Sequence, residues 1–200
     1  SLFELESIFD QDKFVYWIEQ LQPSSYIIPD SLENVEETVT SCENFLNKFK
    51  DIPGEKIGVV QGKNEKELID CYNFMSDNVD IIAISFDYSY YLTIADNYAE
   101  GRIKFIRRLL EKDILNTRKP HHFLGCYLPQ EFKAYKNYKW LKTIDTSNPV
   151  VHAIKGISYT NEGLFFKERI KLVDLIETKI EDINLKLLKH NLSTFKSFCK

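Results

Sequence analysis

Residues 56–85 read KIGVVQGKNEKELIDCYNFMSDNVDIIAIS, in which two apolar runs flank a helical pattern. Both runs, at residues 56–61 and 80–85, are short and rich in β-branched side chains, which is typical of strands buried on both faces. Asn64 lies where its side chain would cap the first turn of the intervening helix. This order predicts two parallel strands in one sheet, joined by a right-handed crossover.

The same alternation extends in both directions from this unit. One apolar run precedes it at residues 26–29, and two follow it at residues 121–127 and 141–145. Helical patterns separate and flank the runs, at residues 1–22, 32–49, 96–115, 129–140 and 164–198. Five strands that alternate with helices predict an α/β fold with a parallel sheet.

Two architectures fit this order of elements: a doubly wound sheet and a (β/α) barrel of the TIM type. Neither GxGxxG nor GxxxxGK[ST] follows an expected strand, so the nucleotide-binding signatures of doubly wound sheets are absent. A complete barrel has eight strands and typically about 250 residues. We therefore expect residues 1–200 to form a single domain, a partial or truncated barrel of about five strands that lacks its N-terminal strands and carries C-terminal helices.

The composition is 44% hydrophobic and 28% charged, which is typical of a soluble globular protein. No apolar run approaches the roughly 20 residues that cross a bilayer. The formal net charge of -4 argues against general coating of nucleic acid and leaves a local basic face open. The cysteines are scattered without a CxxC pair, so we expect a reducing cytoplasm and no metal site: Cys42, Cys71, Cys126 and Cys199.

Functional groups in barrels and parallel sheets gather at the C-terminal ends of the strands. Each expected strand ends in a polar or small residue: Asp30, Gln61, Ser85, Gly125 and Asp145. Asp145 is the strongest candidate for chemistry because it ends a β-branched run and precedes a polar turn closed by Pro149. Asp30 and Asp87 also fit the simpler explanation of a helix cap or turn.

Histidines occur near two of the expected strands. His121 and His122 open a strand, so we expect them at the opposite end of the barrel in structural roles. His152 follows Asp145 and is a weaker candidate for the site.

Three segments, at residues 58–63, 121–132 and 143–156, read GVVQGK, HHFLGCYLPQEF and TIDTSNPVVHAIKG. They resemble, in the same order and at similar separations, the GIVQGG, HYLMGVGxPEDL and MFDCVLPTRxARxG segments of the tRNA-guanine transglycosylase family. In the third segment the Asp, the Pro and the final Gly are in register. The resemblance covers roughly residues 26–177.

The resemblance implies a (β/α) barrel enzyme that exchanges guanine for a 7-deazaguanine base. The family acts on tRNA in queuosine-related modification, and related enzymes of phages and bacteria insert such bases into DNA. This chain looks closer to the DNA-acting branch because it lacks several features of the tRNA enzymes. The implied partners are DNA or tRNA and a 7-deazaguanine base such as a preQ-type precursor, with no cofactor and with a homodimer as a possible assembly.

The resemblance also implies roles for individual residues. Asp145 falls on the nucleophilic aspartate, and Gln61, followed by Gly62, falls on the glutamine that binds the base. Asp30 falls near the aspartate that reads the Watson–Crick edge. The family residues that line the base pocket align with Ser85, Phe86, Leu124 and Gly125.

The chain departs from the family pattern at several positions. Ser85 and Phe86 stand in place of a Gly-Gly pair, and Val151 and Ile154 replace arginines that follow the nucleophile. The CxCxxC…H zinc site and the N-terminal aspartate that serves as general base have no counterpart. The missing zinc site, general base and Gly-Gly pair favour a non-catalytic protein on a decayed barrel.

Nucleic acid would also need contacts outside the base pocket. Basic side chains on two expected helices could bind backbone phosphates, although they also fit ordinary solvated faces: Arg102, Arg107, Lys133 and Lys136. Three aromatic residues after the third strand could stack on a base or pack together at the rim: Tyr88, Tyr90 and Tyr91.

Three functions therefore remain open on the sequence alone. The first is a base-exchange pentosyltransferase that works through a covalent aspartyl-sugar intermediate. The second is a non-catalytic nucleic-acid-binding or interaction protein built on a decayed barrel. The third is an unrelated barrel enzyme that acts on a small sugar or nucleoside.

Overall fold

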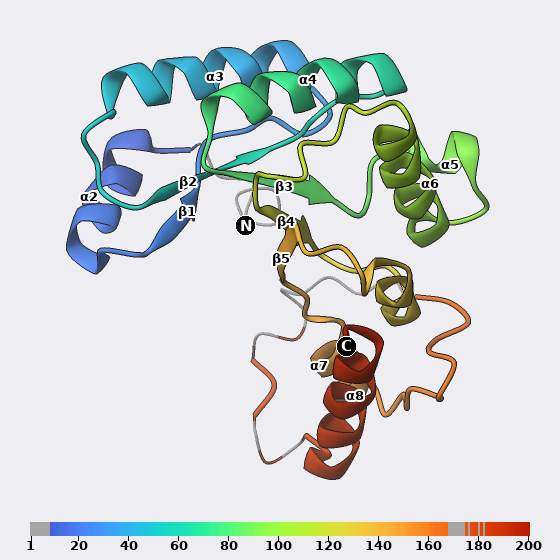
Figure 1. The fold of residues 1–200 in the computed structure, drawn as a ribbon. Coiled ribbons are helices and arrows are strands. Elements are labelled where there is room, and N and C mark those ends of the chain that lie inside the picture. Colours follow the sequence, from blue (N-terminus) through green and yellow to red (C-terminus); the bar gives the residue numbers. More distant parts are fainter. Residues whose placement is uncertain (1–8, 168–174, 176, 180, 182) are drawn as a thin grey trace.

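A computed structural model describes residues 9–167, 175, 177–179, 181 and 183–200. Five parallel strands form one sheet in the order β1-β2-β3-β4-β5, and the sheet curls into a half-barrel (Figure 1). The strands are β1 (Ser25–Ile27), β2 (Glu55–Val59), β3 (Ile81–Ser85), β4 (His121–Leu124) and β5 (Leu141–Ile144). A sheet whose spatial order equals its order in the chain is barrel-like rather than doubly wound, so the expected α/β fold with five parallel strands is confirmed.

Helices follow the strands and cover one face of the sheet, with α3 and α4 side by side over it (Figure 1). The helices are α2 (Gln11–Leu21), α3 (Val35–Lys48), α4 (Glu65–Asn78), α5 (Tyr91–Ile94), α6 (Tyr98–Glu111), α7 (Asn148–Ile154) and α8 (Leu185–Phe198), with a 3-10 helix η1 (Pro129–Tyr135). None of the helices in the described residues is both long enough and apolar enough to span a membrane.

Asparagine caps explain where several helices begin. The Asn64 side chain accepts a hydrogen bond from the Glu67 backbone N–H (3.0 Å), which confirms the expected cap of α4. A cap of this kind satisfies one of the N–H groups that the first turn leaves unpaired. The same arrangement begins three other helices, at Asn34, Asn97 and Asn184.

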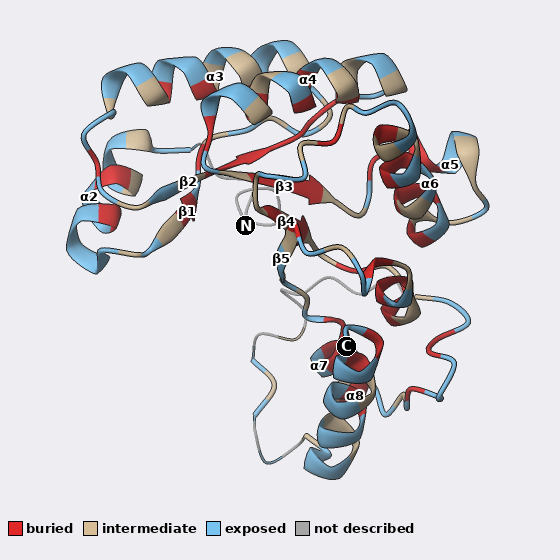
Figure 2. Ribbon diagram, in the orientation of Figure 1, coloured by how far each residue is buried: buried red, intermediate tan, exposed pale blue. Residues whose placement is uncertain are grey.

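The two faces of the sheet are packed differently. Ile82 and Ile84 of β3 belong to the main core beneath the helices, where most buried residues lie (Figure 2). Ala83 points the other way and forms a small cluster with Ile57 and Val59 of β2 on the concave face. In a complete barrel this face would be covered by the opposite strands, whereas β1 and β5 are the outer strands among those that the structure describes.

The expected helical segment at residues 164–198 is described only in part: residues 164–167 are not helical, and residues 168–174, 176, 180 and 182 lie outside the described residues. The helix α8 begins only at Leu185, and the break expected at residues 179–182 lies partly outside the described residues. At Leu164, the backbone N–H donates to Gln130 Oε1 (3.0 Å), and its carbonyl accepts from Gln130 Nε2 (2.6 Å). This side chain satisfies the backbone of Leu164, so no helix is needed there.

Candidate active site

Asp145 follows β5 directly and lies at the mouth of the half-barrel, by which we mean the edge formed by the C-terminal ends of the strands. Its Oδ1 accepts a hydrogen bond from the Gly125 backbone N–H (3.1 Å) and lies 3.2 Å from His122 Nε2. The side chain is 61% exposed, so the carboxylate is held on one side and open on the other. The hydrogen bond to His122 lowers the pKa of Asp145, burial opposes that effect, and Gly125 adds to it.

His122 is a site residue that the sequence did not indicate. Its Nδ1 lies 2.8 Å from Thr143 Oγ1 on the neighbouring strand, and its Nε2 faces Asp145. His122 pairs with Thr143 in the parallel register, and Asp145 lies two residues further along the same face of β5. The expected structural role holds instead for His121, which is buried and hydrogen-bonds to Tyr72.

A second polar pair lies at the ends of β1 and β2. Gln61 Nε2 donates to Asp30 Oδ2 (2.6 Å), and Gln61 Oε1 accepts from the Glu33 backbone N–H (2.9 Å). Burial raises the pKa of Asp30, and the hydrogen bond from Gln61 opposes the rise. Asp30 does not cap α3, because Asn34 takes that position. Two of the residues assigned to base recognition are thus in direct contact.

The two polar groups are separated along the mouth. Asp145 follows β5 and Gln61 follows β2, three strand positions away. With neighbouring strands about 4.8 Å apart, the path along the sheet is roughly 14 Å. Because the sheet curls, the straight-line distance between the two groups is shorter than this path. Asp145 and the Asp30–Gln61 pair therefore share one edge of the half-barrel without touching.

The ends of β3 and β4 lie between these groups. A Cβ atom on Gly125 would come within 2.3 Å of the Phe86 ring, and Gly125 has a φ of +65°, so both the backbone and the close packing favour glycine there. Ser85 Oγ donates to Asp87 Oδ1 (2.6 Å). Leu124 packs against the small apolar cluster on the concave face. The wall between the two polar groups is therefore built from Ser85, Phe86, Leu124 and Gly125.

Gly62 has a packing role beside Gln61. A Cβ atom there would lie 2.8 Å from Glu67 Cβ and from the Leu68 backbone nitrogen, so the glycine lets the first turn of α4 approach the end of β2.

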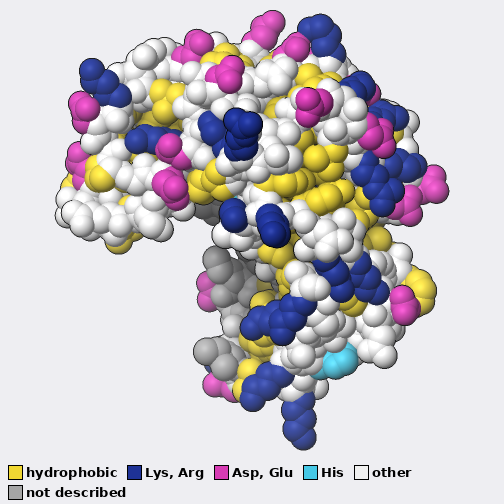
Figure 3. Space-filling view, in the orientation of Figure 1, with side chains coloured by type: hydrophobic (Ala, Val, Ile, Leu, Met, Phe, Trp, Pro, Cys, Tyr) yellow, Lys and Arg dark blue, Asp and Glu magenta, His cyan; other side chains and the backbone are white. Residues whose placement is uncertain are grey.

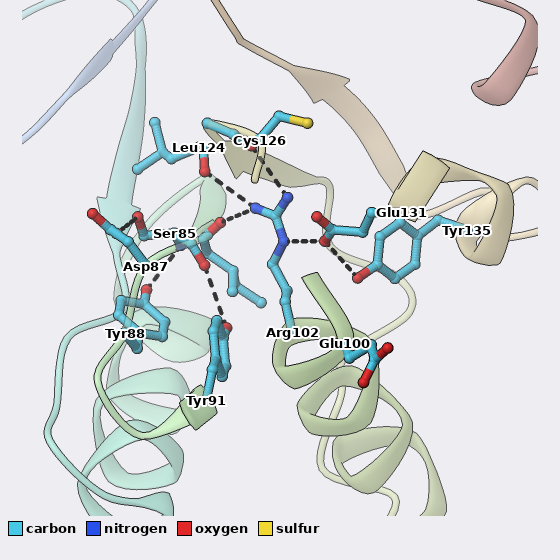
Figure 4. A network of polar contacts seen from close by, with 12 residues as sticks. Ser85, Asp87, Tyr88, Tyr91, Glu100, Arg102, Leu124, Cys126, Glu131 and Tyr135 are labelled. Carbon is cyan, nitrogen blue, oxygen red and sulfur yellow. Dashed lines mark hydrogen bonds and ion pairs between the residues drawn. The ribbon is translucent and has the colours of Figure 1, made fainter. Parts of the chain in front are cut away.

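Arg102 was expected to bind phosphate, and the structure shows this prediction to be wrong. The side chain is fully buried, and its Nε donates to Glu131 Oε1 at 2.5 Å (Figure 4). Its terminal nitrogens donate to the carbonyls of Leu124 and Gly125, each at 3.1 Å. Arg102 thus fixes the mouth end of β4 from behind, and no solvent-exposed N–H remains for a phosphate.

The other predicted phosphate ligands stay on the surface. Arg107 and Lys136 are exposed, and Lys133 lies 3.5 Å from Glu162 and over the ring of Phe198 in α8. On the face in Figure 3, basic side chains lie in several groups over both the upper helices and the lower part of the molecule. That face therefore has no single basic stripe.

The remaining aromatic and histidine candidates are packed into the core. The three tyrosines that follow β3 are buried, which agrees with a packing cluster rather than base stacking: Tyr88, Tyr90 and Tyr91. His152 is also buried, with its Nδ1 2.8 Å from the Asn148 carbonyl, so it does not reach the mouth.

A cavity of about 500 Å³ lies on the concave face at the N-terminal ends of the strands, the end opposite the mouth. Its size is within the usual range for small-molecule sites. His122 and Thr143 belong both to this cavity and to the hydrogen-bond chain that leads to Asp145. The lining residues are Ser25, Glu55, Ile57, Ile81, Pro120, His122, Lys142 and Thr143.

Among the residues that the structure describes, no group of three or more His, Cys, Asp or Glu side chains is arranged to hold a metal ion.

A scan against protein-family models and a search of curated proteins found no match to this chain. The function must therefore be argued from the geometry of the mouth.

Proposed function

We propose that the chain is a base-exchange glycosyltransferase on a TIM-type barrel framework, which replaces guanine by a 7-deazaguanine derivative in DNA or tRNA. The observation that carries the proposal is the state of Asp145. It is an exposed carboxylate at a strand end, with a lowered pKa and one oxygen fixed by His122 and Gly125. This arrangement suits a nucleophile, because the free oxygen can attack while the other one is held.

The reaction would proceed in two displacements at the anomeric carbon of the target nucleotide. In the first, Asp145 bonds to the sugar carbon, the bond to guanine N9 breaks, and guanine leaves with the electron pair and takes up a proton. In the second, the incoming base loses its N9 proton, bonds to the same carbon and displaces the carboxylate. The protons balance over the cycle, and the configuration of the sugar is retained, as in retaining glycosidases.

Recognition of the base would fall to Asp30 and Gln61. An ionised Asp30 can accept hydrogen bonds from the N1–H and the exocyclic amine of a guanine-like base. The hydrogen bond from Gln61 supports this role because it opposes the effect of burial on the pKa of Asp30. Adenine would leave such a carboxylate acceptor without its donors, which favours a guanine-like base. The target base must leave the helical stack to enter such a pocket.

A second candidate function is a non-catalytic nucleic-acid-binding protein on a decayed barrel. The observation in its favour is the open sheet, in which five strands are described and β1 and β5 are the outer ones. In this reading Asp145 would bind a ligand without forming a bond to it.

The experiment that separates the two functions is a trap for the covalent intermediate. The protein is incubated with a guanine-containing DNA oligonucleotide or with tRNA, without an incoming base, and then denatured. We expect a protein–nucleic acid adduct with the wild-type chain and none with Asp145→Asn. Asp70→Asn is the matched control, because Asp70 is an exposed residue of α4 that pairs with Lys66. Absence of an adduct with either polymer would contradict the proposal, and binding of free nucleosides alone would favour an enzyme for small substrates.

A further inference from the structure

Lys167 brings a positive charge to the mouth of the half-barrel. Its Nζ donates a hydrogen bond to the Cys126 carbonyl (3.2 Å) and lies 4.0 Å from the centre of the Phe86 ring. Phe86 directly follows β3, and Cys126 is the second residue after β4. The amine therefore sits where the third and fourth strands end.

This position is adjacent to the candidate nucleophile. Cys126 follows Gly125, whose backbone N–H holds Asp145, and Phe86 packs against Gly125. The same loop thus holds the carboxylate through the Gly125 N–H and the amine through the Cys126 carbonyl.

The chain segment that carries Lys167 is fixed in place. Gln130 hydrogen-bonds to both backbone groups of Leu164, three residues before the lysine. Gly163 has a φ of +109°, and a Cβ atom there would come within 2.0 Å of Gln130 Oε1. The approach of this segment to η1 therefore depends on a glycine, and it directs Lys167 back to the strand ends.

The surroundings of the amine leave it able to bind an anion. Lys167 is half-buried, and burial lowers the pKa of its amine, while the charge of Asp87 acts in the opposite direction. Within the described part of the chain, no carboxylate oxygen lies within ion-pair distance of its Nζ. An ammonium group has three donors, and the Cys126 carbonyl uses one of them. Arg102, the other cation behind this loop, is already paired with Glu131.

We propose that Lys167 binds the backbone phosphate next to the nucleotide whose sugar reacts with Asp145. This inference rests on the proposed function and names the residue that would hold the nucleic-acid strand beside the reacting sugar. Lysine binds phosphate as a point charge, and a cation beside the anomeric carbon would hold the strand in register for attack. Lys167 thereby supplies the contact that the buried Arg102 does not.

The test measures how binding of a guanine-containing oligonucleotide depends on salt. Each phosphate contact adds about 0.7 to 0.9 to the slope of log affinity against log salt concentration. We expect Lys167→Met to reduce the slope by this amount and to weaken binding at low salt, while Lys167→Arg keeps both. Lys167→Gln retains a donor to the Cys126 carbonyl without the charge, and we expect the same reduced slope from it.

A matched control is Lys48→Met, because Lys48 is an exposed lysine at the C-terminal end of α3, away from the mouth. Its slope should equal that of the wild type. If Lys167→Gln is folded by circular dichroism and keeps the wild-type slope, the phosphate contact is refuted. An effect of Lys167→Met on guanosine 5′-monophosphate but not on the oligonucleotide would also refute it.

The outcome is distinguishable from a failure of base exchange. An adduct at Asp145 together with an unchanged slope for Lys167→Gln would leave base exchange standing and remove the phosphate contact. A reduced slope without any adduct would leave the phosphate contact standing and remove the transglycosylase.

Discussion

His122 favours the ionised form of Asp145. The His122 hydrogen bond is the largest cause of the lowered pKa of Asp145. A carboxylate must be deprotonated to attack a sugar, so a lowered pKa extends the active range toward acid. Proton uptake by Asp145 would set the acid limb of the rate profile.

We expect His122→Phe to move the acid limb of adduct formation to higher pH. Loss of the hydrogen bond raises the pKa of Asp145, so protonation stops the attack at a pH where the wild type still reacts. His122→Gln is the control, since its amide can still donate to Asp145 and should keep the limb closer to that of the wild type. The measurement is the rate of adduct formation against pH, and identical profiles for all three proteins would exclude this role of His122.

At the residue scale, the sequence locates the ends of the strands but does not show which way each side chain on a strand points. Asp30, Gln61 and Asp145 were found because each ends an apolar run, and strand ends can be located from the sequence. His121 and His122 differ by one position, and only the register of β4 decides which of them faces the core. That register depends on the pairing with β5, so the roles of the two histidines could not be assigned from their own segment.

Arg102 joins three elements. It lies on α6, donates to carbonyls at the end of β4 and forms an ion pair with Glu131 of η1. Tyr135 donates to the same Glu131 oxygen at 2.9 Å. A buried ion pair of this kind contributes to stability mainly because each partner would be a costly unpaired charge without the other.

We expect Arg102→Met to destabilise the fold by roughly 3 to 5 kcal/mol, because Glu131 would remain buried without its partner. Urea denaturation measures the loss. The loss should shrink as the pH falls, since burial already raises the pKa of Glu131 and a protonated Glu131 has no charge to bury.

The double variant Arg102→Met, Glu131→Leu is the control for this prediction, and it should recover most of the lost stability. If the single and double variants were equally unstable, packing rather than charge would explain the effect.

Helical periodicity in α6 distinguishes a buried arginine from an exposed one. Arg102 is spaced three, four and seven residues from Phe105, Ile106 and Leu109, all of which are buried. This spacing places the arginine on the apolar face of the helix. Arg107 lies off that face and is exposed, so helical periodicity separates the two arginines where basic composition alone does not.

At the scale of the whole molecule, the proposed function assigns separate tasks to the two ends of the mouth. The Asp30–Gln61 pair would select the base, and Asp145 would perform the displacement. Because these groups lie three strands apart, a change at one should leave the geometry of the other intact.

We expect Asp30→Asn to reduce the rate of adduct formation on guanine-containing DNA on the order of 100-fold, because one of the two acceptor oxygens is replaced by an NH2 donor that would face a donor of the base. The salt dependence of binding should not change. Glu36→Gln, on the exposed face of α3, is the matched control. A normal rate for Asp30→Asn would show that Asp30 does not read the base.

The half-barrel itself was largely predictable, because its five strands coincide with short apolar runs that alternate with helical patterns. The path of the C-terminal region was harder to predict from the sequence. Leu164 is held by a side chain, Gln130, that is far away in the sequence, and periodicity does not reveal such a contact. The path of the segment that brings Lys167 to the mouth could therefore not be read from its composition.

The most direct measurement is to locate the trapped sugar on the protein. The wild-type adduct is digested with protease and nuclease, and the modified peptide is sequenced by mass spectrometry. We predict a nucleotide remnant on the carboxylate of Asp145, within the peptide that contains Thr143. A remnant on any other residue, or unmodified peptides from a chain that binds the nucleic acid, would contradict the account.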